Sequence, residues 1–114
     1  MLEFLNDRNE NVELEALCKT VRALIKHDEF SQCEKLAADA CGRFPHAAEP
    51  HNLFGVVLEL EGMHPEAMRH FRAAWALDPT FLPARYNLDK FGTFYDDGCY
   101  AIDASDCCDR RVKC

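Results

Sequence analysis

The chain has 114 residues, of which 48% are apolar, 29% charged and 11% aromatic, with a formal net charge of −7 and seven cysteines. This length fits one domain with one core, the apolar content excludes disorder of the whole chain, and the acidic charge argues against nucleic-acid partners. Because no apolar run reaches the roughly 18 residues of a membrane-spanning helix and the start MLEFLNDRNE lacks the layout of a secretory signal, we expect a cytoplasmic protein with no membrane partner.

Apolar residues recur at helical spacing in the first half of the chain. Five of them share one face of the first predicted helix: Leu14, Leu17, Val21, Leu24 and Ile25. Asn11 precedes this run as a candidate N-cap. The second run begins at Phe30, with Ser31 and Glu34 as a candidate capping box, and ends at Gly42.

Three further helices are predicted downstream, over residues 53–60, 65–77 and 83–91. Pro65 and Pro83 suit the first turn of the last two helices, because proline lacks the N–H group that this turn leaves unpaired. No stretch alternates with the period of two that a half-buried strand requires. The predicted fold class is therefore all-α.

A shift of 34 residues superposes the helix stops of one part of the chain on those of the next. It places Asp28 on Gly62 and Pro45 on Pro79, and it matches small residues with small residues at the expected helix crossings. Repeated pairs of helices are the architecture that this period indicates.

The second unit, residues 48–81, resembles a tetratricopeptide repeat. The residues that carry the resemblance are His51, Phe54, Gly55, Leu58, Gly62, Ala67, Phe71, Ala74 and Pro79. The first unit, residues 14–47, keeps the length and the proline of the motif, and residues 82–93 are predicted to form a capping helix. The resemblance implies antiparallel helix-turn-helix pairs stacked as a short right-handed superhelix. Residues 1–13 would form an N-terminal head and residues 94–114 a Cys/Asp-rich C-terminal tail.

Two repeats and a cap are a short array, since about three units are normally needed for stability. Packing of the head on the first helix, or pairing of two copies through Phe91, Phe94 and Tyr95, would cover the ends of such a stack. The sequence therefore does not decide between a monomer and a homodimer.

Proteins of this family are scaffolds and adaptors that hold peptides or helices of partner proteins in a concave groove lined by the first helix of each pair. The resemblance implies a protein or peptide partner, no enzyme activity and no cofactor. The candidate partner-binding residues follow helical spacing along that groove: Cys18, Arg22, Lys26, Asn52, Val56, Glu59, Tyr86 and Lys90. Asn52 suits the backbone amides of an extended peptide, and Tyr86 suits an apolar side chain. Arg22 and Lys90 suit a carboxylate.

The C-terminal tail carries the alternative function, that of a thiol-based redox sensor or metal-binding protein. Four cysteines there offer thiolates for zinc or an iron–sulfur cluster: Cys99, Cys107, Cys108 and Cys114. Their gaps of seven, none and five residues depart from the usual gaps of about two to four within zinc-ligand pairs. We therefore expect no metal site and an unstructured or exposed, oxidisable tail. Cys33, on the second predicted helix, is expected to be a packing residue.

Overall fold

The computed structural model describes residues 2–92, 100–103 and 106, with side chains from residue 9 onward. The helices are α1 (Leu2–Lys26), α2 (Phe30–Arg43), α3 (Glu49–Leu60), α4 (His64–Leu77) and α5 (Leu82–Phe91). No strand occurs in the described ranges, so the predicted all-α class is confirmed. None of these helices is long and apolar enough to cross a membrane.

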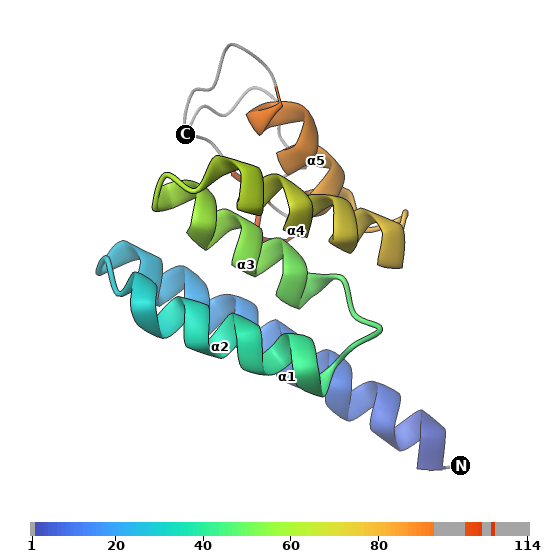
Figure 1. Cartoon of the computed structure of the whole chain (residues 1–114). Coiled ribbons are helices and arrows are strands. Elements are labelled where there is room, and N and C mark those ends of the chain that lie inside the picture. Colours follow the sequence, from blue (N-terminus) through green and yellow to red (C-terminus); the bar gives the residue numbers. More distant parts are fainter. Residues whose placement is uncertain (1, 93–99, 104–105, 107–114) are drawn as a thin grey trace.

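The helices are arranged as two hairpins followed by a closing helix. α1 and α2 lie side by side, α3 and α4 form the second hairpin, and α5 packs beyond it (Figure 1). Consecutive helices are in contact, and α1 also contacts α3, as α3 contacts α5. α3 therefore lies between α1 and α5 and contacts both.

The core lies between the hairpins and joins them. Its fully buried members include Val21, Cys33, Leu53, Val56, Val57, Ala67 and Phe71. Gly55 lets α3 and α4 approach closely, because a Cβ atom on this residue would lie 2.5 Å from Cε1 of Phe71. Phe71 in turn stacks on Phe91 of α5, with ring centroids 5.8 Å apart. The predicted packing role of Cys33 is confirmed, since its side chain is 0% exposed.

The turns after α1 and α3 use the same backbone conformation. Asp28 has a φ of 58° and Gly62 a φ of 83°, both in the left-handed region. The 34-residue shift aligns these two positions. The two hairpins thus end their first helices in the same way, although only one of them has a glycine there.

The expected start of the first helix was wrong. α1 begins at Leu2, so Asn11 lies inside the helix instead of capping it, and the predicted boundary between residues 1–13 and the first unit falls within α1. Residues 2–13 contain neither glycine nor proline, and nothing in their backbone chemistry stops the helix from extending towards the N-terminus.

The expected capping box of the second helix was also wrong. α2 begins at Phe30 and its N-cap residue is Glu29, which makes no side-chain cap hydrogen bond. Phe30 packs against the core and so belongs to the helix, which places Ser31 in the first turn. Glu34 instead hydrogen-bonds to Glu61 across the hairpins, and this bond raises the pKa of Glu61 to about 7.

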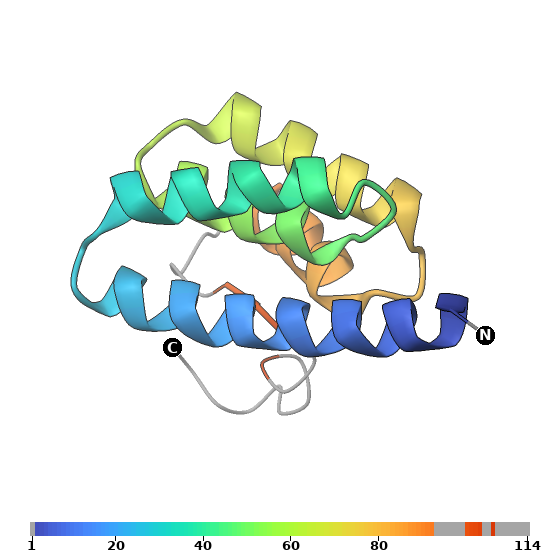
Figure 2. The ribbon, with the colours of Figure 1, turned by 90° about the horizontal axis from the view of Figure 1, so that it is seen from below.

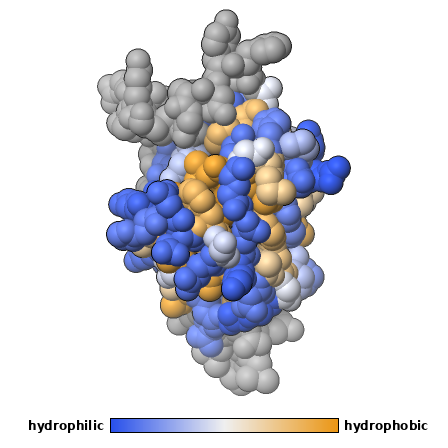
Figure 3. Space-filling view, turned by 60° about the vertical axis from the view of Figure 1, so that its left-hand side comes forward, coloured by the Kyte–Doolittle hydropathy of each residue, from blue (hydrophilic) through white to orange (hydrophobic). Residues whose placement is uncertain are grey.

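Several large apolar side chains remain on the surface: Val12, Leu60, Met63, Trp75, Leu77 and Leu82. On the face drawn in Figure 3, apolar patches are interleaved with hydrophilic residues. Phe91, one of the residues considered for pairing two copies of the chain, is only 6% exposed and is stacked on Phe71. Phe94 and Tyr95 lie outside the described residues.

Candidate functional site

A short part of the C-terminal region packs against the side shared by α1, α3 and α5. We call Tyr100, Ala101, Ile102, Asp103 and Asp106 the docked segment, and the side of the helices that they contact the docking face. Residues 101–103 run beside α1 (Figure 2). Ala101 and Ile102 are both 0% exposed, and Ile102 belongs to the main core cluster. The expectation of an exposed tail is therefore wrong for these residues, because Ile102 gains more from burial than from contact with water.

Two buried asparagines hold the backbone of Ala101. Nδ2 of Asn87 donates to the carbonyl oxygen of Ala101 at 2.8 Å, and the N–H of Ala101 donates to Oδ1 of Asn87 at 2.8 Å. Nδ2 of Asn52 donates to the same carbonyl at 2.9 Å. Nδ2 of Asn87 also donates to Oδ1 of Asn52 at 2.8 Å, which ties the two amides together. We call this pair the asparagine clamp; it binds one residue of a backbone through the N–H and C=O groups of that residue.

The asparagine clamp depends on its occupant. Asn52 and Asn87 are both 0% exposed, and no buried side-chain nitrogen or oxygen in the described part of the chain lacks a hydrogen-bond partner. A buried amide that loses its partner costs about 1–3 kcal/mol. The clamp is therefore satisfied only when a backbone segment or water fills the space between α3 and α5.

Arg22 binds the two carboxylates of the docked segment. Its Nη2 lies 3.1 Å from Oδ2 of Asp103 and 2.8 Å from Oδ2 of Asp106, while Nη1 lies 3.3 Å from Oδ1 of Asp106. The hydrogen bond to Asp106 raises the pKa of Arg22. This forked contact is the geometry in which a guanidinium recognises a carboxylate best.

Asp106 also folds the docked segment into a turn. Its Oδ2 accepts hydrogen bonds from the N–H groups of Ile102 at 2.8 Å and Asp103 at 3.1 Å, and its own N–H donates to the carbonyl of Asp103 at 3.1 Å. Burial opposes ionisation of Asp106, but the bonds from Arg22 and from these N–H groups outweigh it and lower the pKa of Asp106. The carboxylate thus has a structural role within the segment as well as an ionic one.

A pocket of about 430 Å³ lies beside the docked segment. It is lined by Leu14, Glu15, Cys18, Lys19, Glu49, Phe81, Ile102 and Asp103. Burial raises the pKa of Cys18 to about 12 and also raises the pKa of Glu49. Cys18 is therefore a protonated thiol at neutral pH, which suits packing and not nucleophilic chemistry.

Four of the predicted partner-binding residues lie on or behind the docking face. Arg22 and Asn52 make a carboxylate contact and a backbone contact, respectively, but with the chain's own docked segment. Cys18 and Val56 were expected to line an open groove, and this needs correction: they are 6% and 0% exposed and belong to the core. Cys18 lines the pocket beside Ile102 and Asp103, and Val56 shares the main core cluster with Ile102, so the docked segment completes the core to which both residues belong.

The other four predicted residues have different surroundings. Lys26 is exposed in the last turn of α1. Glu59 bonds to His64, with Oε1 2.8 Å from Nδ1. Nζ of Lys90 lies 5.8 Å from the ring centroid of Tyr86, one turn away on α5.

Sequence reasoning missed Asn87. The 34-residue shift pairs Asn52 with Tyr86, whereas the structure pairs it with Asn87, one position further along. The signal that could have found it is a second asparagine on the first helix of the next unit, one position after the one that the 34-residue period aligns with Asn52. A prediction of helix phase that is wrong by one residue is enough to hide it.

The four cysteines proposed for the alternative function, Cys99, Cys107, Cys108 and Cys114, lie outside the described residues. Within the residues whose side chains are described, no group of three histidine, cysteine or acidic side chains is placed to hold a metal ion.

His51 and His70 form a close pair on α3 and α4, with their Nδ1 atoms 3.1 Å apart. The ring of His70 also stacks on Phe54, with centroids 4.4 Å apart. Burial lowers the pKa of both histidines. The short contact requires one Nδ1 to donate and the other to accept, so at least one ring is neutral.

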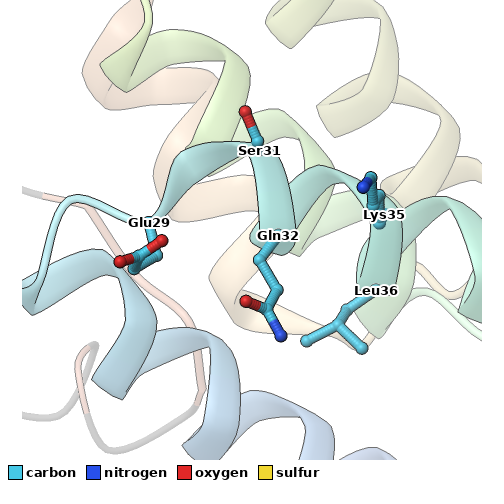
Figure 4. Close-up of a pocket in the computed structure, with 5 residues that line it drawn as sticks. All are labelled: Glu29, Ser31, Gln32, Lys35 and Leu36. Atoms are coloured by element: carbon cyan, nitrogen blue, oxygen red, sulfur yellow. The ribbon is translucent and has the colours of Figure 1, made fainter.

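A second pocket, of about 530 Å³, lies at the start of α2 and is lined by Glu29, Ser31, Gln32, Lys35 and Leu36. Ser31 and Gln32 extend to opposite sides of the helix (Figure 4), so the polar groups do not converge on one point. This arrangement offers no defined binding geometry.

Comparison of the chain with protein-family models, with curated proteins and with solved structures gives no match.

Proposed function

We propose that this chain is a non-enzymatic protein-interaction module, a short tetratricopeptide-like array that binds an extended peptide of a partner protein on its docking face. The observation that carries the proposal is the asparagine clamp. Two fully buried amides bind both backbone polar groups of one residue, Ala101, through 2.8–2.9 Å hydrogen bonds. Such contacts suit any backbone in an extended form.

The composition of the docking face suits the binding of a peptide backbone. Apolar residues at the positions of Asn52 and Asn87 would leave the buried N–H and C=O groups of that backbone without partners. Arg22 adds a cation on the neighbouring helix, at a distance from the clamp that one short peptide spans. Together they offer a peptide both backbone and side-chain contacts.

The repeat identity rests on separate features. Asp28 and Gly62, 34 positions apart in the sequence, share the left-handed conformation, and Gly55 meets Phe71 at the closest point of α3 and α4. Both features fit the tetratricopeptide pattern. We propose the cytoplasm as the location, where reducing conditions keep thiols such as those of Cys18 and Cys33 free.

The test is the selection of binding peptides from an unbiased displayed library, with full-length protein carrying Ile102→Asp as the bait. A carboxylate at this buried position disfavours docking of the chain's own segment and leaves Asn52 and Asn87 unchanged. We expect enriched peptides whose binding is lost when the bait also carries Asn87→Asp, because aspartate keeps the shape but cannot donate to a peptide carbonyl.

Asn11→Asp makes the same chemical change at an exposed position and is the matched control, with circular dichroism to verify the fold of every bait. If no peptide is enriched, or if the enriched peptides bind equally well to Asn87→Asp, the proposed function is wrong.

A further inference from the structure

The docked segment has a specific chemistry beyond its backbone. Ala101 sits in the asparagine clamp with no exposed surface, and Ile102 enters the main core cluster. Asp103 and Asp106 meet Arg22, and Asp106 closes the turn by accepting two backbone N–H groups. The order is a small residue, a branched apolar residue, an acid and, three positions later, a second acid.

Each of these features imposes a requirement on an occupant of the docking face. The clamp residue must be small, because it is enclosed completely. The next side chain must be apolar, because its position is fully buried in the main core cluster, together with residues such as Val21 and Leu53. Carboxylates must follow, because the partly buried guanidinium of Arg22 binds the carboxylates of both Asp103 and Asp106.

Resting on the proposed function, we propose that the partner of the docking face is an acidic peptide with this same order of residues, and that the chain's own docked segment competes with it in cis. The partner binds by displacing Ala101 and Ile102 and by supplying its own carboxylates to Arg22. The docked segment thus has the same chemistry as the proposed ligand and inhibits the binding of that ligand.

The competition has a predictable size. A segment tethered to the same chain acts at an effective concentration of about millimolar order and therefore occupies the docking face in most chains. A free peptide binds only the chains whose docking face is vacant, so its apparent affinity is its intrinsic affinity multiplied by the vacant fraction. The pocket of about 430 Å³ beside Ile102 and Asp103 gives a longer partner peptide additional surface that the docked segment leaves unfilled.

The experiment measures the binding of a labelled peptide with the sequence of residues 100–106, YAIDASD, by fluorescence anisotropy. The hosts are the full-length wild type and the full-length Ile102→Asp chain. Ala101→Pro is a second way to release the segment, because proline removes the N–H group that Asn87 accepts. We expect both released chains to bind the peptide at least about tenfold more tightly than the wild type does.

The carboxylate requirement is tested with a second peptide, YAINASN, in which asparagine replaces both aspartates. We expect it to bind the released chains about tenfold or more weakly than YAIDASD, since hydrogen bonds to charged groups are the stronger ones. Adding Arg22→Gln should remove this difference between the two peptides. Arg72→Gln, an exposed residue on α4, is the matched control and should preserve it.

Three results would overturn the proposal. The first is equal binding of YAIDASD to wild-type and released chains, and the second is equal binding of the two peptides. The third is a wild-type dimer that Ile102→Asp converts to a monomer. This result would mean that the docked segment of each copy binds the docking face of the other copy. If the unbiased library yields clamp-dependent peptides of another composition, this inference fails while the proposed function stands. If the library yields none, the proposed function itself fails.

Discussion

At the scale of single residues, the docking face combines two kinds of recognition. Asn52 and Asn87 bind the backbone N–H and C=O groups of one residue, whose side chain has only to be small, whereas Arg22 binds carboxylates. Backbone contacts supply affinity, and the charged contact supplies selectivity. Replacing Asn87 should therefore weaken every peptide, whereas replacing Arg22 should weaken acidic ones.

The histidine pair gives a prediction on pH. Because burial lowers the pKa values of His51 and His70 in the folded state, the stability linked to them is present above the ordinary value of 6.5 and is lost as the pH falls through the lowered values. We expect the free energy of unfolding, measured with urea, to decrease from about pH 7.5 to about pH 5, and to decrease less in His51→Gln.

His46→Gln changes an exposed histidine and serves as the control for this prediction. An unchanged pH dependence in His51→Gln would show that the buried pair does not contribute.

At the scale of the elements, close helix contact and helix ends explain the hairpins. α3 and α4 meet where Gly55 faces the ring of Phe71, and the helices before both hairpin turns end in left-handed residues. These features fix how the helices of each pair lie together. Phe71 also stacks on Phe91, so the same aromatic ring joins the second hairpin to α5, the helix that carries Asn87 of the asparagine clamp.

Gly55→Ala should destabilise the fold. An added Cβ atom would lie 2.5 Å from Cε1 of the fully buried Phe71, so either the ring or the helix must move. We expect a loss of about 1–3 kcal/mol in the free energy of unfolding, in spite of alanine's better helix propensity. Gly42→Ala is the control, because nothing lies within 4 Å of its added Cβ, and it should be neutral or stabilising by up to about 1 kcal/mol. Equal effects of the two substitutions would refute the close-contact explanation.

The two left-handed turn residues predict opposite responses. Gly62→Ala places a Cβ atom at a φ of 83° and should lower stability by about 1 kcal/mol. Asp28→Gly relieves the same conformation at 58° and should raise stability by up to about 1 kcal/mol. Thermal unfolding of the two variants measures both, and a decrease in stability for Asp28→Gly would contradict the prediction.

At the scale of the whole molecule, residues at the two ends of the sequence complete one structure. Arg22 on α1 and Asp106 are 84 positions apart, yet they form the ion pair that holds the docked segment. The chain therefore covers its own docking face and completes its core with Ile102. A partner that displaces the docked segment therefore also removes Ile102 from the core.

Docking should respond to acid. Because the pKa of Asp106 is lowered below its ordinary value of 3.8, the docked segment is stabilised by the carboxylate above that value, and this stabilisation is lost as the pH falls through the lowered pKa. We expect the amide NMR signal of Ala101, whose N–H is bound to Asn87, to stay constant from neutral pH down to about pH 4.5 and to shift below it. In Asp106→Asn, that acid transition should be absent or much reduced. A wild-type transition centred near neutral pH would show that another group controls docking.

The sequence by itself determined the all-α class, the order of the helices and the places where most of them end. Spacing of apolar residues, Pro65, Pro83 and the aligned pair of Asp28 and Gly62 are local signals, and local backbone chemistry acts on neighbouring residues. The sequence also selected Arg22 and Asn52 as residues suited to carboxylates and backbone amides.

Only the tertiary structure decided what these residues contact. The burial of Cys18 and Val56, the role of Asn87 and the docking of Ala101 and Ile102 depend on how distant helices face one another. Helical spacing gives the face of a residue to within about one position, and a shift of one residue turns a side chain by about 100°. Contacts across 35 to 84 positions arise from packing of the whole chain, which no local pattern in the sequence records.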